Sequence, residues 1–254
     1  MPKLGIGSSL TRAGLTTPGI VTDSLVLKHN YAAGGVVPVS DGAAYFDGTD
    51  DYIDTGNSFQ STFRADFSIA FWMKAVDGQP GSQEILFGMR DSGATDSNIL
   101  VLEADGTFTW TYRCDNGTES TATSSVVFAD DGVTDWTHIA LTTDDGNDDM
   151  YLYVNGVSVA LDDDLSGVTM SDFTLSETFY IGAQNNAGSS ANWFDGYICN
   201  VGIWSAALTQ AQIKSIMWKN YADLTTSETT NLVSWWNLSA DANDNHGSND
   251  GTLS

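Results

Sequence analysis

One segment constrains the fold of this chain more than any other, the apolar run at residues 193–204. Phe194 and Trp204 stand near the ends of the run, which has the length of a β-strand, and Asp195 with Gly196 permits a bend at its start. The pattern predicts a strand that leads almost directly into the next element.

A short helix is predicted immediately after this strand. Thr209 stands three residues before Gln212, which is the spacing of a capping box, and Leu208 and Ile213 occupy the two positions of a hydrophobic staple. We expect the helix over residues 209–221. Two boundary signals agree at its start, and chance explains such agreement poorly.

Short strands separated by Asp, Gly and Asn turns are expected from about residue 43 to residue 204. In two of these strands the large apolar residues recur at every second position, which places them on one face. They are Phe67, Ile69, Phe71 and Met73 in the first strand and Phe108, Trp110 and Tyr112 in the second. The acidic residues 144–149 are expected to form a hairpin loop.

Six segments follow one another in a fixed order along the chain. They are residues 45–53, 67–73, 136–141, 152–157, 179–182 and 193–204. The ordered set resembles the laminin-G-like jelly rolls of the concanavalin A-like lectin/glucanase superfamily, over roughly residues 43–221. The resemblance implies an all-β fold, a two-sheet antiparallel jelly-roll sandwich with one short C-terminal helix.

The chain divides by composition into an arm and one domain. Residues 1–40 have no sustained periodicity and are expected to form an extended N-terminal arm. Residues 41–254 are expected to form the jelly-roll domain, because a single all-β sandwich commonly occupies a chain of this length. The tail at 232–238 looks like the opening strand of such modules, and we expect it to close the sandwich beside the first strand. A truncated second repeat is the alternative.

The chain is strongly acidic. It carries 33 Asp and Glu residues, all but five of them Asp, against 9 Lys and Arg, which gives a formal net charge of −24. Such a surface repels nucleic acid and anionic membranes, so we expect neither as a partner, and it favours cations. The first residues lack the apolar core of a secretory signal, and no run has the length of a membrane span. We therefore expect synthesis in a host cytoplasm.

Patterns that would indicate catalysis are sparse. Glycosidases of the superfamily place closely spaced acids on one strand, whereas the Glu residues here are isolated. They are Glu84, Glu103, Glu119, Glu177 and Glu228. We expect no enzymatic activity and no catalytic residues, with a hydrolase that uses Asp as the alternative. His138 is expected to be an ordinary strand residue, and Cys114 and Cys199 to be buried free thiols, with a disulfide as the alternative.

Calcium is the metal that the composition favours, because hard cations bind carboxylate and carbonyl oxygens in turns. The resemblance points to Asp47 and Asp51 near the first motif, Asp195 before the closing strand and Asp244 in the tail. The alternative is that these carboxylates are solvated, since Asp is also a preferred turn residue.

A sugar site is expected at residues 184–193, which lead into the predicted strand. Such a site combines an exposed aromatic ring with amide hydrogen bonds, and Asn185, Asn186, Asn192 and Trp193 have that composition. The alternative for Trp193 is a position under its own loop.

Two functions follow from these observations. The first is a non-catalytic structural and binding module on the surface of a phage particle. It would decorate the capsid or attach to the host, form a homo-oligomer and bind surface glycans, with the arm anchored to neighbouring virion proteins. The second is a free carbohydrate-binding lectin or an accessory module of a secreted bacterial protein.

Overall fold

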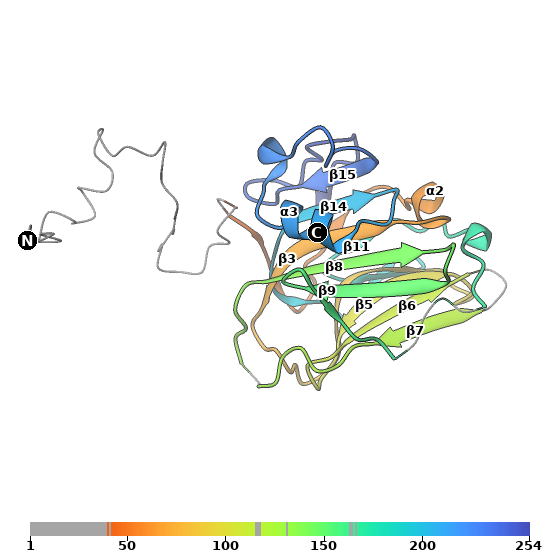
Figure 1. Cartoon of the computed structure of the whole chain (residues 1–254). Coiled ribbons are helices and arrows are strands. Elements are labelled where there is room, and N and C mark those ends of the chain that lie inside the picture. Colours follow the sequence, from red (N-terminus) through yellow and green to blue (C-terminus); the bar gives the residue numbers. More distant parts are fainter. Residues whose placement is uncertain (1–39, 41, 115–117, 131, 163–164, 166) are drawn as a thin grey trace, which may run out of the picture. The chain divides into compact units, whose positions relative to one another are not determined.

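The chain folds into two β-sheets that pack face to face (Figure 1). The computed structural model describes residue 40 and residues 42–254, apart from 115–117, 131, 163–164 and 166. The expected arm at residues 1–40 therefore lies, except for Ser40, outside the described residues. Neighbouring strands run antiparallel, except that β12 lies parallel to β4. The sequence-based expectation of a jelly-roll sandwich is confirmed.

The first sheet, called sheet A, is built around one long strand. Its order is β1 (Ala44–Asp47), β14 (Asp195–Trp204), β3 (Ser68–Ala75), β8 (Thr137–Asp144), β9 (Asp149–Val154) and β10 (Val157–Val159), and β15 (Leu232–Trp236) also pairs with β14. Strands β8 and β9 join through the acidic turn that the sequence predicts.

The second sheet, called sheet B, contains the strands that carry the polar outer face described below. Its order is β16 (Thr252–Leu253), β2 (Ile53–Asp54), β11 (Tyr180–Ile181), β4 (Glu84–Arg90), β5 (Ser97–Leu102), β6 (Phe108–Arg113) and β7 (Glu119–Thr123). The hairpin of β12 (Gln184–Asn186) and β13 (Ser189–Ala191) adds to the β4 edge. Short helical turns lie at α2 (Gln60–Phe63), η1 (Met170–Asp172) and η2 (Tyr221–Asp223).

The core lies between the two sheets and is rich in aromatic rings. The side chains that alternate in the sequence of β3 and β6 all point into it and are buried, as predicted. Each contributes about 1.5–3 kcal/mol to the free energy of folding. The Tyr112 hydroxyl donates to the Phe63 carbonyl at 2.5 Å, so the one polar group that this ring carries inward is satisfied. Cys114 and Cys199 are buried and free, which confirms the thiol prediction.

Helix α3 (Gln210–Ile216) follows β14 and begins where the sequence predicts. Thr209 and Gln212 form the expected capping box. The helix ends at Ile216, so the predicted end at residue 221 is wrong. Past Ile216 the helical pattern gives way to a tighter turn, in which the Lys219 N–H donates to the Ile216 carbonyl at 2.9 Å. The groups that could continue the helix have distant partners, since the Met217 carbonyl accepts from the Trp72 indole (2.8 Å) and the Tyr221 N–H donates to Asn237.

The outer face of sheet A is largely covered by α3 and the tail. Ala70 and Ala140 on the sheet pack against Ile213 of the helix and Trp235 of the tail in one buried cluster. His138 is a buried β8 residue, as expected, and burial lowers the pKa of its imidazole to about 3. In the described part of the chain, no helix is long and apolar enough to cross a bilayer.

The tail closes both sheets. Strand β15 pairs with the second half of β14, beyond the half that pairs with β1, and β16 pairs with β2. A strand is present within the predicted segment 232–238, at Leu232–Trp236, but it pairs with β14 and not with the first strand, β1. Trp236 is fully buried, meets Phe59 edge to face, and donates its indole N–H to the Asn249 carbonyl at 2.9 Å.

We predict that Trp236→Ala lowers the free energy of unfolding by about 3–5 kcal/mol, because it leaves a cavity where the tail meets the core. Trp218→Ala removes the same ring from a side chain that is 54% exposed and should cost about 1 kcal/mol or less. Equilibrium urea unfolding of the two variants measures the difference. Equal losses would show that the tail does not contribute to the cooperative core.

Candidate functional site

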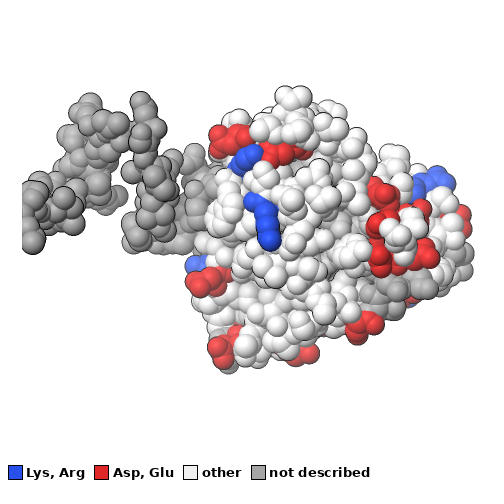
Figure 2. Space-filling model, in the orientation of Figure 1, with Lys and Arg blue, Asp and Glu red and all other residues white. Residues whose placement is uncertain are grey.

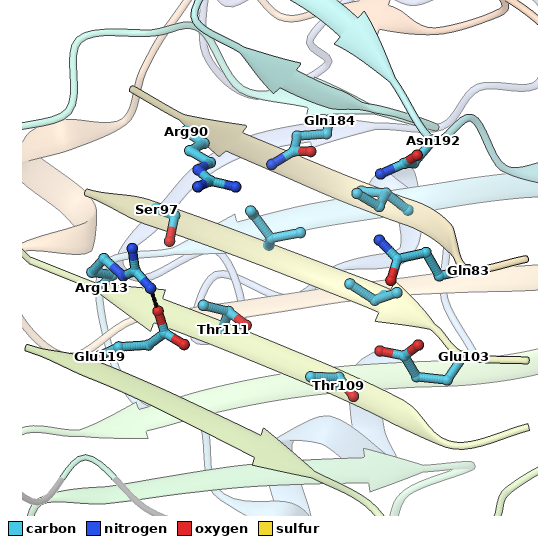
Figure 3. Close-up of a pocket in the computed structure, with 13 residues that line it drawn as sticks. Gln83, Arg90, Ser97, Glu103, Thr109, Thr111, Arg113, Glu119, Gln184 and Asn192 are labelled. Atoms are coloured by element: carbon cyan, nitrogen blue, oxygen red, sulfur yellow. Dashed lines mark ion pairs between the residues drawn. The ribbon is translucent and has the colours of Figure 1, made fainter. Parts of the chain in front are cut away.

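The outer face of sheet B is hollowed by a groove of about 310 Å³ (Figure 3). Its floor comes from the adjacent strands β4, β5 and β6. One rim comes from β7, and the other comes from β12 and Asn192. Side chains from these strands reach the groove together because alternate residues of a strand face the same side of a sheet.

A small apolar cluster forms the middle of the groove floor. It consists of Ile85, Ile99 and Val101. Gly88 lies beside them, and a methyl group on its Cα would come within 3.3 Å of the Cγ2 atoms of Ile85 and Ile99. Gln184 is the backbone neighbour of Gly88 on β12, which places its side chain beside this cluster.

Charged side chains form a row across one end of the groove. Arg90, Ser97, Arg113 and Glu119 are successive cross-strand partners on β4, β5, β6 and β7. Arg113 forms an ion pair with Glu119 and donates to the Ala94 carbonyl, which neutralises this part of the row. The Arg90 guanidinium makes no ion pair or hydrogen bond with any described residue.

Two polar side chains of the groove are almost fully buried and yet lack a protein partner. Ser97 is 3% exposed and Gln184 is 6% exposed, and neither side chain hydrogen-bonds to another residue in the described part of the chain. Their polar atoms are not among the fully enclosed side-chain atoms without a partner in the described part of the chain, so these atoms face the groove. The groove therefore offers hydrogen-bonding groups that remain available to a molecule inside it.

The structure places one of the four predicted sugar-binding residues in the groove and the other three outside its lining. Asn192 is exposed and lines the groove, whereas Asn186 is exposed but is not among the lining residues. The Asn185 side chain holds its own hairpin, since its amide donates to the Thr178 carbonyl at 2.8 Å and its oxygen accepts from a backbone N–H. Trp193 is half-buried, with an indole nitrogen that is buried and has no partner among the described residues. One of the four predicted residues thus belongs to the groove.

Sequence reasoning missed most of the groove. The alternation of Thr109, Thr111 and Arg113 with buried aromatic residues marks an outward polar face, but many solvated strands look the same. Ser97 and Arg90 meet only through strand pairing, which the sequence does not reveal.

Three of the four predicted metal ligands lie near one another. Asp47 pairs with Asp195 across β1 and β14, and the ligand oxygens of Asp47, Asp50 and Asp51 lie within 4.8 Å of one another. Sequence reasoning missed Asp50. Gly48, at φ +71°, lets this loop approach Asp195, because a methyl group at Gly48 would come 2.9 Å from the Asp195 Cβ atom.

Asp195 is an unusual carboxylate in this cluster. Burial raises its pKa, the charge of Asp47 raises it further, and a hydrogen bond with the Tyr45 hydroxyl partly opposes the rise. Its Oδ1 atom is buried without a hydrogen-bond partner among the described residues. The neighbouring Glu84 accepts from the Asp195 N–H at 3.2 Å, and burial is the main cause that raises the Glu84 pKa to about 7. The cluster therefore holds acidic oxygens that a cation would satisfy.

Asp244 lies elsewhere and has a different role. Its carboxylate accepts hydrogen bonds from the backbone N–H groups of Trp235, His246, Gly247 and Asn249. Burial alone would raise its pKa, but these donors lower it. Trp235 pairs with β14 at position 202, seven residues from Asp195, which separates the two sites by about 20 Å along the strand. The structure thus does not bring this predicted ligand to the other three.

The comparisons with known proteins agree with this architecture. A family model described as the concanavalin A-like lectin/glucanases superfamily matches residues 47–214, more than half of the chain. No curated protein matches it.

Several solved structures share the fold. The CBM40 of the Ruminococcus gnavus IT-sialidase has a TM-score of 0.54 at 18% identity, with 70% of this chain and 99% of that chain covered. The same CBM40 bound to α2,3 sialyllactose gives 0.56 at 17%, covering 72% and 100%. A proposed carbohydrate-binding protein from Bacteroides ovatus gives 0.59 at 20%, covering 83% of this chain and 57% of that one. At these identities the likeness concerns the fold alone. With its matched family model and its jelly-roll sheets, the chain belongs to the concanavalin A-like lectin/glucanase superfamily.

Proposed function

We propose that this protein is a non-catalytic glycan-binding module and that the groove on sheet B holds the sugar. The observation that carries the proposal is the pair of buried polar side chains, Ser97 and Gln184, that have no partner among the described residues. They lie next to the apolar floor of Ile85, Ile99 and Val101. A sugar ring needs both kinds of surface, because it presents hydroxyl groups at its edge and C–H groups on its faces.

The similar structures support this assignment. The Ruminococcus gnavus CBM40 has been solved with α2,3 and with α2,6 sialyllactose, and the Bacteroides ovatus protein is described as a proposed carbohydrate-binding protein. The open outer face of sheet B also supports it, because the helix and tail occupy much of the other outer face.

The spacing of the groove's carboxylates supports a role without catalysis. Glu119 lies in the same cross-strand row as Ser97. Glu103 comes six residues after Ser97, so about 20 Å of strand separates it from that row. Glycosidases that use two carboxylates hold them about 5–10 Å apart. Glu119 is also neutralised by Arg113, which makes it a poor base.

A position on a phage particle is the finer part of the proposal. It is supported by the acidic composition, with a net charge of −24, and by the expected arm at residues 1–40. Figure 2 shows acidic side chains in several separate clusters on one face of the molecule, with few basic ones among them. Attachment to virion proteins through the arm and assembly as a homo-oligomer stay predictions from the sequence.

We predict that the double variant Ser97→Ala, Gln184→Ala binds its glycan about tenfold more weakly, because it removes two hydrogen-bonding groups without disturbing the backbone. A glycan array with neutral and acidic oligosaccharides identifies the ligand, and calorimetry with that ligand measures the dissociation constant. The matched control is Gln60→Ala, Ser158→Ala, which makes the same chemical changes away from the groove and should bind like the wild type. Failure of the wild type to bind any glycan, or unchanged affinity of the groove variant, would refute the function.

We also propose that the acidic cluster binds calcium through Asp47, Asp51 and Asp195, joined by Asp50. The orphaned Asp195 Oδ1 and the convergence of the three loop carboxylates support it. Oxygen ligands from a turn suit Ca²⁺, and the ion would neutralise carboxylates that otherwise repel one another.

Calcium should therefore raise the melting temperature. An ion at a hundred times its Kd adds about 2.7 kcal/mol, which corresponds to roughly 5 °C or more for a domain of this size. Melting is compared in EDTA, magnesium and calcium at equal ionic strength. The shift should be lost in Asp51→Asn and in Asp195→Asn, and it should persist in the exposed control Asp130→Asn. Equal melting temperatures in all three solutions would remove the calcium proposal.

A further inference from the structure

Arg90 stands out in the groove as a cation without a hydrogen bond or ion pair to the described residues. Its guanidinium is half-buried at the β4 end of the charged row. Figure 3 shows it turned toward the open groove, between Gln184 and Ser97. Arg113, in the same row, is neutralised by Glu119.

The nearest acidic neighbour in sequence, Asp91, lies close enough for the Arg90 charge to help lower its pKa, but no ion pair joins the two side chains. Asp91 Oδ1 accepts from the N–H groups of Thr95 (2.8 Å) and Asp96 (3.3 Å), and Oδ2 accepts from the Thr95 hydroxyl (2.6 Å). The Asp91 carboxylate is thereby committed to its own turn. The five N–H donors of Arg90 remain available, in a planar arrangement that matches the two oxygens of a carboxylate.

The groove also lacks the feature that would suit an uncharged sugar. Among the described residues that line it, none is aromatic. An aromatic ring offers a large and rigid apolar surface for stacking, and the aliphatic floor here is a smaller substitute. A ligand must therefore be held largely by hydrogen bonds and charge.

The charges along the groove would orient such a ligand. Arg90 lies at one end, and Glu103, whose carboxylate has no partner in the described part of the chain, lies at the other. The two ends are about 20 Å apart along β5. A negatively charged group is attracted to the first end and repelled by the second, whereas the neutral hydroxyls of a sugar can meet Ser97 and Gln184 between them.

We propose that the groove selects sugars that carry a carboxylate and that Arg90 binds this carboxylate in a two-pronged hydrogen-bonded pair. The inference rests on the glycan-binding function proposed above and names its substrate class, acidic sugars. Uronic and sialic acids share the chemistry that Arg90 would recognise, and the experiment separates them.

The test is calorimetry of the full chain with two matched ligand pairs. Tri-galacturonic acid is compared with its methyl ester, in which the same sugar has no charge, and 3′-sialyllactose is compared with lactose. In at least one pair, the wild type should bind the acid at least tenfold more tightly than the neutral partner. Arg90→Gln should abolish this preference, and Arg90→Lys should retain part of it. Arg64→Gln is the control, because Arg64 is exposed and donates to the Ser171 carbonyl.

The outcomes separate the two proposals. The acid selectivity would be overturned if the wild type and Arg90→Gln both bound the acid and the neutral member of each pair equally. If Ser97→Ala, Gln184→Ala weakened that binding, the groove would still be a glycan site. Binding of none of the four ligands would also overturn it, while the glycan array decides the general function separately. Melting curves show whether each variant is folded, and a folded Arg90→Lys still tests the acid selectivity if Arg90→Gln unfolds.

Discussion

Strand β14 is the element on which both the sandwich and its open surface depend. Its first half pairs with β1, its second half pairs with β15, and its other edge pairs with β3 along most of its length. The beginning and the end of the domain are therefore joined through the backbone of one strand. Because α3 follows β14 after a short turn, the connection keeps the helix next to sheet A, where it packs on the outer face. Since α3 and the tail cover much of the outer face of sheet A, the outer face of sheet B is the broad sheet surface that stays accessible to a ligand.

The two candidate sites meet at the beginning of β4. Glu84 accepts from the N–H of Asp195, which belongs to the acidic cluster, and the next residue, Ile85, lines the groove. The Ile85 N–H donates to the Asn192 carbonyl at 2.8 Å, so the rim of the groove and the segment that leads to Asp195 are held together by backbone bonds. A cation at the acidic cluster would stabilise the framework of the groove without touching the sugar.

The sequence predicts the fold far better than the site. Periodicity predicts the inward faces of β3 and β6, and local spacing predicts the Thr209 cap, because both depend on neighbours in the chain. The helix end could not be predicted, since it depends on Trp72, a residue of a distant strand. The groove depends on two registers, the hairpin register that brings Arg90 beside Ser97 and the long-range register that brings Gln184 beside Gly88. Periodicity within one strand reveals neither register.

The most direct test of the account is to map a bound glycan by backbone amide chemical shifts in the ¹⁵N-labelled protein. The account predicts that the shifts concentrate on β4, β5 and β6 and on Gln184 during titration with a glycan that the array identifies. Sheet A carries the exposed rings of Tyr45 and Tyr197, and Trp218 is exposed just beyond α3, so these rings offer a competing surface for stacking. Shifts that concentrate around those rings and leave β4 to β6 unchanged would contradict the central claim.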